Sequence, residues 1–249
     1  MLSVNGVTVL PTIFPDQTSQ VWKLPAEVFE SSTCDIIWRF QNEAEVMQLF
    51  QLNHLLSKKY KARVLLMHYL PYARQDKKVS NDATFALHSF AHILNLMDFS
   101  EIRCFDPHSD VALELIGRFV PVYPKAEVFD AYQRCRADIV AYPDEGAFNK
   151  YTRVYKDLGF NHIYGEKNRD QSTGWITGYR LVGTAHNQNV LIVDDICDGG
   201  ATFIHLTRAL REAGAKEVNL FVSHGIFSKG LQPLKDAGIN RIFTKEGQL

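Results

Sequence analysis

Asn189-Val-Leu-Ile-Val-Asp-Asp-Ile-Cys-Asp-Gly-Gly-Ala-Thr202 is the stretch of sequence that decides the fold of this chain. Its apolar part, Val190 to Val193, is typical of a central parallel strand that is buried on both faces. Gly199 and Gly200 allow positive φ and let a ligand approach the backbone closely. A periodic helical segment, Phe203 to Ala213, begins just after Thr202. A helix N-terminus offers N–H groups and the positive end of a dipole, so the stretch predicts a place for a phosphate.

Two carboxylates, Asp194 and Asp195, stand beside this turn. Carboxylates repel phosphate, but they can accept hydrogen bonds from hydroxyls or hold Mg²⁺. No Gly-Lys-Ser/Thr follows the turn, and the glycines lack the Gly-x-Gly-x-x-Gly spacing, which excludes a Walker loop and a dinucleotide loop. We therefore expect a cradle for a ribose ring that carries a phosphate. The alternative is an ordinary strand-to-helix turn with acidic residues placed by chance.

Composition limits the class of protein. The chain has 249 residues, 46% hydrophobic content and a net charge of −1, which suits one or two α/β domains. Its four cysteines lie far apart without metal-ligand spacing, and no signal-like segment opens the chain, so we expect reduced thiols and a cytoplasmic location. No run approaches the length of a membrane span, and the near-neutral charge gives no footprint for nucleic acid. The expected partners are small molecules and copies of the chain itself.

The remaining sequence alternates between strand and helix patterns. We expect strands at 7–13, 20–24, 34–40, 63–69, 102–106, 138–142, 162–166, 175–182, 190–193, 217–223 and 241–244, and helices at 43–58, 83–97, 111–117, 147–158, 203–213 and 231–237. This alternation implies parallel sheets with helices on both faces, in two halves that we expect at 1–130 and 131–249. His88 and His92 share one face of the second helix, but no third ligand accompanies them, which favours a surface or packing role.

Polar clusters follow several of these strands, at the ends where parallel sheets bind ligands. Pro71-Tyr-Ala-Arg-Gln-Asp-Lys-Lys78 follows the strand at 63–69 and delivers Arg74, Lys77 and Lys78 into one loop. The planar, permanently charged guanidinium of arginine suits a polyphosphate. A lone basic loop is, by default, a solvated run of charges.

Six stretches, taken in chain order, resemble motifs of the ribose-phosphate pyrophosphokinase (phosphoribosyl-diphosphate synthetase) family. They are the ATP-loop-like Pro71–Lys78, the metal-loop-like Asp106-Pro-His-Ser-Asp110, Tyr142-Pro-Asp-Glu-Gly146, the Lys-x-Arg segment Glu166-Lys-Asn-Arg169, the opening stretch, and Ser223-His-Gly-Ile-Phe-Ser228. The resemblance implies an α/β fold of two phosphoribosyltransferase-like halves, each a mainly parallel sheet flanked by helices. The first half would bind ATP, and the second would hold the ribose phosphate.

The resemblance also implies a reaction, in which the β,γ-diphosphate of ATP moves to the 1-hydroxyl of ribose 5-phosphate and AMP is released. Lys167 and Arg169 would be catalytic and contact the transferring phosphates, while His108 and Asp144 would face Mg²⁺, the expected cofactor. The implied ATP-binding residues are Phe14, Asp16, Thr18, Arg74, Gln75, Asp76 and His108. The implied ribose-phosphate-binding residues are Asp194, Asp195, Asp198, Gly199, Gly200, Ala201 and Thr202.

The sequence departs from the family pattern in several places. Asp16 and Thr18 stand where the family has asparagine and glutamate, and the chain is shorter than the pattern at both ends. Phe14 lies in a loop that resembles the one a neighbouring subunit lends to the adenine, so we expect a homodimer or a higher homo-oligomer.

Three alternatives stay open. Gly199 and Gly200 leave the sugar loop bare, so the substrate could be a larger 5-phosphoribosyl compound such as ADP-ribose. A phosphoribosyltransferase would share the opening stretch but has no use for Pro71–Lys78. A non-catalytic regulatory homologue would commonly lose catalytic-site residues, whereas Lys167, Arg169, His108 and Asp144 are all present.

Overall fold

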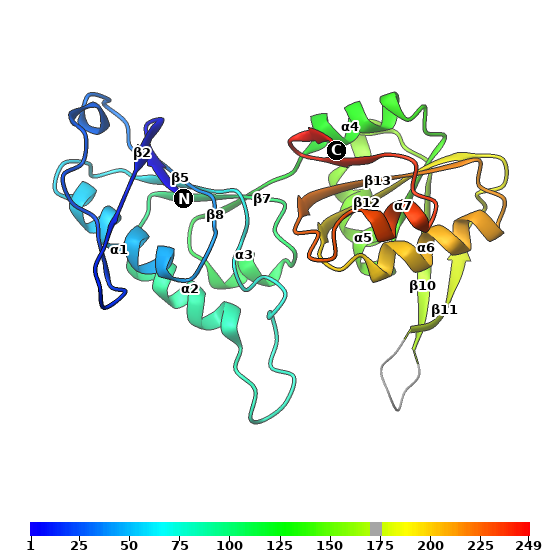
Figure 1. Cartoon of the computed structure of the whole chain (residues 1–249), viewed down its shortest axis with the longest axis horizontal. Coiled ribbons are helices and arrows are strands. Elements are labelled where there is room, and N and C mark those ends of the chain that lie inside the picture. The colour runs from blue at the N-terminus through cyan, green and yellow to red at the C-terminus, as the bar shows by residue number, and fades with distance from the viewer. Residues whose placement is uncertain (170–175) are drawn as a thin grey trace. The chain divides into compact units, whose positions relative to one another are not determined.

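The computed structural model describes residues 1–169 and 176–249, without the side chains of residues 167–178. The chain forms two compact α/β units, Met1–Val122 and Tyr123–Leu249 (Figure 1). This boundary lies earlier in the chain than the one expected at residue 130. The reason is the helix α4 (Lys125–Arg134), which buries Val128 and Ala131 in the core of the second unit.

The first unit is built on a six-stranded sheet of order β2-β1-β5-β6-β7-β8, in which β5 to β8 are parallel and β1 and β2 form an antiparallel edge. Its strands are β1 (Leu2–Val4), β2 (Val7–Val9), β5 (Asp35–Trp38), β6 (Val64–Met67), β7 (Glu101–Phe105) and β8 (Phe119–Val122). The helices are α1 (Ala44–Ser57), α2 (Ala86–Leu96) and α3 (Val111–Leu115), with a 3-10 turn at Ala26–Phe29. A separate hairpin consists of β3 (Thr12–Ile13) and β4 (Ser19–Gln20).

The second unit has a seven-stranded sheet of order β11-β10-β9-β12-β13-β14-β15, with antiparallel edges at β11 and β15. Its strands are β9 (Ile139–Tyr142), β10 (His162–Arg169), β11 (Ile176–Val182), β12 (Asn189–Cys197), β13 (Glu217–Gly225), β14 (Ile242–Thr244) and β15 (Gly247–Gln248). Its helices are α4, α5 (Glu145–Val154), α6 (Ala201–Glu212) and α7 (Gln232–Asp236), with a 3-10 turn at Lys156–Leu158.

The central strand β12 explains why its sequence is a continuous apolar run. Val190 and Ile192 belong to the core on one face of the sheet, together with α6. Leu191 and Val193 belong to the core on the other face, together with α4 and α5. A strand buried on both faces needs apolar residues at every position rather than at alternate ones.

The expected fold class is confirmed, and several element boundaries were wrong. β1, β8, α4 and β15 were not expected, and the strand expected at 20–24 is reduced to the two residues of β4. β10 and β12 run further than expected, so Lys167, Arg169, Asp194 and Asp195 lie within strands and not in the loops beyond them. Within the described residues, no helix has both the length and the apolar character needed to cross a bilayer.

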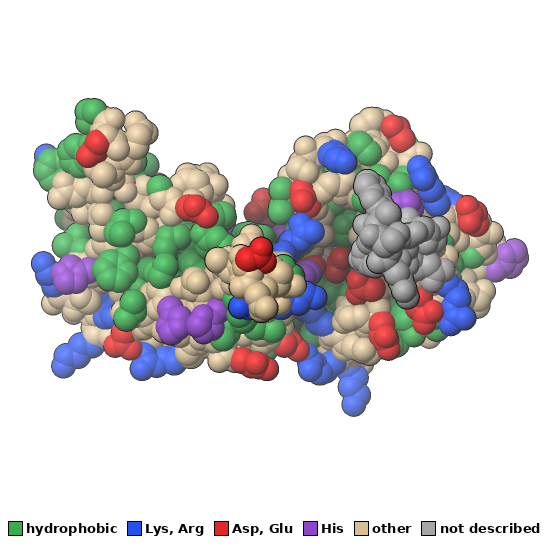
Figure 2. Space-filling view, turned by 90° about the horizontal axis from the view of Figure 1, so that it is seen from below, with side chains coloured by type: hydrophobic (Ala, Val, Ile, Leu, Met, Phe, Trp, Pro, Cys, Tyr) green, Lys and Arg blue, Asp and Glu red, His purple; other side chains and the backbone are tan. Residues whose placement is uncertain are grey.

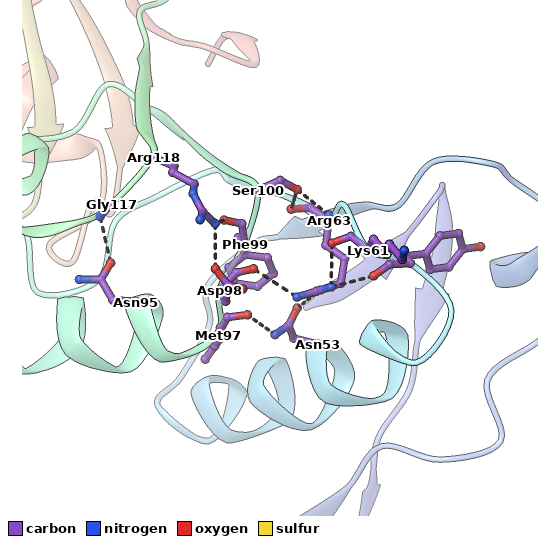
Figure 3. Close-up of polar contacts among 11 residues, drawn as sticks. Asn53, Lys61, Arg63, Asn95, Met97, Asp98, Phe99, Ser100, Gly117 and Arg118 are labelled. Atoms are coloured by element: carbon purple, nitrogen blue, oxygen red, sulfur yellow. Dashed lines mark hydrogen bonds and ion pairs between the residues drawn. The ribbon is translucent and has the colours of Figure 1, made fainter.

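A buried arginine organises the amino-terminal end of the first sheet (Figure 3). Arg63 is 6% exposed, and its Nε donates to Asn53 Oδ1 at 2.8 Å while Nη1 donates to the Tyr60 carbonyl at 2.7 Å. Nη2 donates to the Asp98 carbonyl at 3.2 Å, and Asn53 Nδ2 donates to the Met97 carbonyl at 2.6 Å. These bonds join the end of α1, the start of β6 and the turn after α2, at the sheet end away from the ligand-binding loops expected from the sequence.

Candidate active site

The candidate site of the second unit lies where the short strand β9 ends between two longer neighbours. β9 pairs with β10 as far as Tyr142 opposite Tyr164, and with β12 as far as Ala141 opposite Ile192. β10 then continues to Arg169 alongside β11, and β12 continues to Cys197 alongside β13. Polar residues on the extended parts of β10 and β12 therefore flank the place where β9 turns into α5.

The acid pair lies on the extended part of β12. The side chain of Asp195 is 5% exposed, its Oδ1 accepts from the Ile196 amide at 2.8 Å, and its Oδ2 lies 4.0 Å from Lys150 Nζ. Burial raises the pKa of the Asp194 carboxyl well above its ordinary value, and the neighbouring Asp195 and Asp144 raise it further. Because the two carboxyls oppose each other's ionisation, the pair can donate as well as accept hydrogen bonds to sugar hydroxyls.

The glycine turn after β12 is shaped by contacts with α7. Gly200 has φ +78°, and a Cβ added there would lie 2.9 Å from Leu234 Cδ2, so the position requires glycine for both backbone and steric reasons. At Gly199 an added Cβ would meet Lys229 Cε at an ordinary 3.6 Å. α6 begins directly after the turn, at Ala201. The first N–H groups of a helix have no intrahelical acceptor, and here they follow the acid pair by a few residues.

Asp144 lies where β9 passes into α5. It is the N-cap of that helix, and its Oδ1 accepts from the Ala147 amide at 2.9 Å, which fixes the direction of the carboxylate. Among the residues that the structure describes, no three His, Cys, Asp or Glu side chains gather into a metal-binding group. His108 belongs to the first unit, so the two residues expected to face Mg²⁺ come from different units.

Lys167 and Arg169 lie on the part of β10 that extends past the sheet. Lys167 pairs with Tyr179, and Arg169 pairs with Ile176, both on β11. The hairpin formed by β10 and β11 projects beyond the other strands of the unit in Figure 1. Lys167 follows Tyr164 by three strand positions, roughly 10 Å along the chain. The side chains of Lys167 and Arg169 fall outside the described residues.

The loops expected to bind ATP follow the carboxyl-terminal ends of strands in the first sheet. β6 and β7 are parallel neighbours, so Arg74 and His108, which follow them, start from the same edge. Leu70 and Ala73 are buried and anchor the first loop, which leaves Arg74 exposed. Gln75 is exposed too, Asp76 is partly exposed, and the Gln75 amide donates to the Tyr72 carbonyl at 2.8 Å.

The Phe14 loop is the turn of the β3–β4 hairpin. Phe14 is 39% exposed, and its amide donates to the Thr18 carbonyl at 2.9 Å. Asp16 Oδ1 accepts from the Thr18 hydroxyl at 2.7 Å and from the Thr18 amide at 3.1 Å, and these bonds lower the pKa of Asp16. Gln51 of α1 ties the hairpin down through the Val21 amide and the Ser19 carbonyl. The loop therefore presents the exposed phenyl ring of Phe14 on a turn that hydrogen bonds hold in shape.

Two other sequence features are the histidine pair of α2 and the four cysteines. His88 and His92 pack edge to face with ring centroids 4.7 Å apart. The four cysteines are buried thiols, and burial raises the pKa of Cys34 to about 11 and those of Cys135 and Cys197 to about 12. The thiols of Cys34, Cys135 and Cys197 are therefore protonated at neutral pH.

One residue of this site, Lys150, was not expected from the sequence. It lies on the inner side of α5, in the segment where a helix was expected, but no local pattern marks it as different from a surface lysine. The available signal was its position among inward-facing aromatic residues, Phe148 and Tyr151.

Comparisons with known proteins agree with this geometry. Residues 148–246 match the model of the phosphoribosyl transferase domain. A ribose-phosphate pyrophosphokinase of Pyrococcus abyssi is 29% identical over 185 residues, which cover 74% of this chain and 64% of that protein. The ribose-phosphate pyrophosphokinase of Sulfurisphaera tokodaii is 26% identical over 254 residues, which cover 98% of this chain and 86% of that protein.

The fold also matches a solved structure. The phosphoribosylpyrophosphate synthetase from Mycobacterium smegmatis superposes with a TM-score of 0.78 at 20% identity, covering 95% of this chain and 79% of that one. This likeness extends over both units, each a mainly parallel sheet flanked by helices. This likeness shows that the chain has the same phosphoribosyltransferase-type fold, and the curated relatives and the six ordered motifs show its similarity to the ribose-phosphate pyrophosphokinase family.

Proposed function

We propose that this protein is a ribose-phosphate diphosphokinase, which transfers the diphosphate of ATP to the 1-hydroxyl of ribose 5-phosphate. The observation that carries the proposal is the acid pair Asp194 and Asp195 on β12, a few residues before the glycine turn and the N-terminus of α6. The names of the curated relatives support the same activity.

The second unit would hold the sugar phosphate. Its 5-phosphate would accept hydrogen bonds from the N–H groups of residues 198–202 at the start of α6, which also carries the positive end of the helix dipole. The carboxyls of Asp194 and Asp195 would bind the ribose hydroxyls. The raised pKa of Asp194 suits this place, because an acid pair that takes up a proton more readily repels the nearby phosphate less than two full negative charges would.

The first unit would hold ATP through the loops at the carboxyl edge of its sheet. The exposed guanidinium of Arg74 suits the polyphosphate, and Gln75 and Asp76 lie in the same loop. His108 follows the neighbouring strand β7. Phe14, held by the Asp16–Thr18 turn, would offer its ring to the adenine of a neighbouring subunit.

Lys167 and Arg169 would contact the phosphates that move. The sugar 1-hydroxyl oxygen forms a bond to the β-phosphorus of ATP, the bond from that phosphorus to the oxygen of AMP breaks, and the hydroxyl proton is released. Charge accumulates on the migrating and departing oxygens, so fixed positive groups and in-line placement supply most of the catalysis. Alanine in place of Lys167 therefore removes a group that acts mainly in the transition state.

The protein offers donors that fit Mg²⁺. This ion keeps several waters and takes one or two carboxylates together with substrate phosphates, so a dense cluster of protein ligands is not needed. Asp144 fits this pattern, since its carboxylate is oriented by the α5 cap, and His108 would lie on the ATP side. When bound, Mg²⁺ would neutralise charge on the phosphates of ATP.

We also propose that the protein is a cytoplasmic homodimer or higher homo-oligomer. Hydrophobic side chains gather over the first unit on the face drawn in Figure 2. Met47 and Phe50 of α1 and Ile93 and Leu96 of α2 are exposed, and a groove of about 390 Å³ is lined in part by Val46 of α1 and Phe90 and Ile93 of α2. Exposed apolar area of this kind is typical of protein interfaces.

The test is an assay of AMP release from ATP and Mg²⁺, with and without ribose 5-phosphate. Release that requires ribose 5-phosphate and yields a product with a 1-diphosphate supports the proposal. A parallel assay with ADP-ribose decides between the two sugar phosphates. Absence of AMP release with both compounds, from a protein that binds ATP, would favour a regulatory homologue instead.

A further inference from the structure

Lys150 lies close to Asp195 of the acid pair in a largely buried position. Its side chain is 13% exposed, and Nζ donates to the Tyr151 hydroxyl at 3.3 Å. Nζ also lies 4.7 Å from the centre of the Tyr151 ring and 5.8 Å from that of Tyr123. Burying a lysine is costly unless its charge is compensated, so its position implies a partner.

That compensation includes the carboxylate of Asp195. Lys150 Nζ lies 4.0 Å from Asp195 Oδ2, while Asp195 Oδ1 accepts from the Ile196 amide. The two oxygens of Asp195 thus face two different positive or donor groups. A carboxylate held at both oxygens has little freedom to rotate about its side-chain bonds.

The elements that carry the pair are themselves fixed. α5 starts at its Asp144 cap, and Tyr151 and Val154 of the same helix pack into the core that also contains Leu191 and Val193 of β12. Lys150 therefore approaches β12 at Asp195, on the face of the sheet that carries Leu191, Val193 and α5.

We infer that Lys150 is a positioning residue for the sugar phosphate, which acts by holding Asp195 in the orientation that binds a ribose hydroxyl. This inference rests on the proposed function, because it assumes that the acid pair binds the sugar. Lys150 has no direct contact with substrate in this assignment. Its removal should weaken sugar binding and leave ATP binding unchanged, since the ATP loops belong to the first unit.

The experiment is calorimetric titration of the full-length protein with ribose 5-phosphate, and separately with ATP, at constant Mg²⁺. Lys150→Met should weaken ribose 5-phosphate binding by about tenfold or more, because Asp195 then loses the positive charge that orients it. Lys150→Arg should retain binding within about threefold, because it keeps the charge. Lys156→Met is the matched control, since Lys156 is exposed and has no ion pair within the described part of the chain.

A double-mutant cycle tests whether Lys150 acts through Asp195. Asp195→Asn alone should weaken ribose 5-phosphate binding, and adding Lys150→Met should then weaken it by less than about threefold. Additive losses, or equal losses for ATP and ribose 5-phosphate, would show a general structural role and overturn the inference. If Lys150→Met does not fold, Lys150→Gln replaces it in the same cycle.

The outcomes separate this inference from the proposed function. A wild-type protein that binds no ribose 5-phosphate would refute the proposed function, and the inference with it. A wild-type protein that binds ribose 5-phosphate, with a Lys150→Met variant that binds it equally well, would refute the inference alone.

Discussion

Replacing Arg63 by methionine should destabilise the first unit strongly. Arg63 carries a buried charge whose partners in the described part of the chain are all uncharged acceptors: Asn53 Oδ1 and the carbonyls of Tyr60, Lys61 and Asp98. Methionine matches the length of the aliphatic stem but leaves these acceptors without their donor. Each buried acceptor without a partner costs about 1–3 kcal/mol, and part of this is offset because the charge no longer needs to be desolvated.

The expected net loss is about 3–5 kcal/mol in the free energy of unfolding, because two buried and two part-buried neutral acceptors lose their donor at about 1–3 kcal/mol or less each. Arg118→Met is the matched control. Arg118 donates to Asp98 Oδ1 at 2.8 Å and lies in the same region (Figure 3), but its side chain is 57% exposed. Loss of an exposed ion pair costs roughly 0–1 kcal/mol.

The assay is urea unfolding of both variants, followed by tryptophan fluorescence and by hydrogen exchange of the β6 amides. Trp22 and Trp38 belong to the first unit, and Trp38 is fully buried, so its emission reports that unit. Hydrogen exchange distinguishes unfolding of the first unit from unfolding of the second. This distinction is needed because a chain of two units need not unfold in one step. An Arg63→Met variant no less stable than Arg118→Met would refute the reasoning, because desolvation of the guanidinium would then cancel all of its hydrogen bonds.

Four further predictions concern the proposed site. Lys167→Ala should lower kcat by about two or more orders of magnitude with little change in ATP affinity, and near wild-type turnover in a steady-state assay would contradict its catalytic role. Alanine at Asp194 or Asp195 should raise KM for the sugar phosphate more than KM for ATP, and an effect on ATP alone would mean that the two substrates are exchanged. Asp194→Asn should also stabilise the protein at pH 8. The folded state raises the pKa of this carboxyl, so ionising it costs more free energy in the folded protein than in the unfolded chain. The gain in stability, measured from urea midpoints, should shrink as pH falls through that raised pKa. Mixing inactive Phe14→Ala with inactive Lys167→Ala should restore part of the activity through hybrid oligomers. If labelled subunits are seen to exchange and no activity returns, the adenine site is not shared between subunits.

The sequence predicted the fold best at positions where a single requirement, such as burial on both faces of a sheet or a positive φ, restricts the residue type. Val190 to Val193 must be apolar because both faces of β12 are covered, and Gly200 must be glycine because of its φ and of Leu234. Such positions show in the sequence as a run or a turn signal. The parallel architecture followed from them.

Other features depend on tertiary contacts and left little local signal. α4 is a polar helix with few buried residues, Val128 and Ala131 among them, so its pattern is weak. β10 continues through charged residues because β11 supplies its hydrogen bonds, a partner that local periodicity does not reveal. Lys150 is the clearest case, since only the packing of α5 against β12 distinguishes it from a solvated lysine.

The short length of β9 sets a fixed width for the candidate site. β10 and β12 flank β9, so beyond its end their backbones stand two strand spacings apart, about 9–10 Å. This width is set by main-chain hydrogen bonds within the sheet, and side-chain substitutions in the loops leave it unchanged. The sheet therefore limits the breadth of the ligand. Substitutions can change the length of the side chains on β10 and β12, but a different distance between the two backbones would require a different number of strands between them.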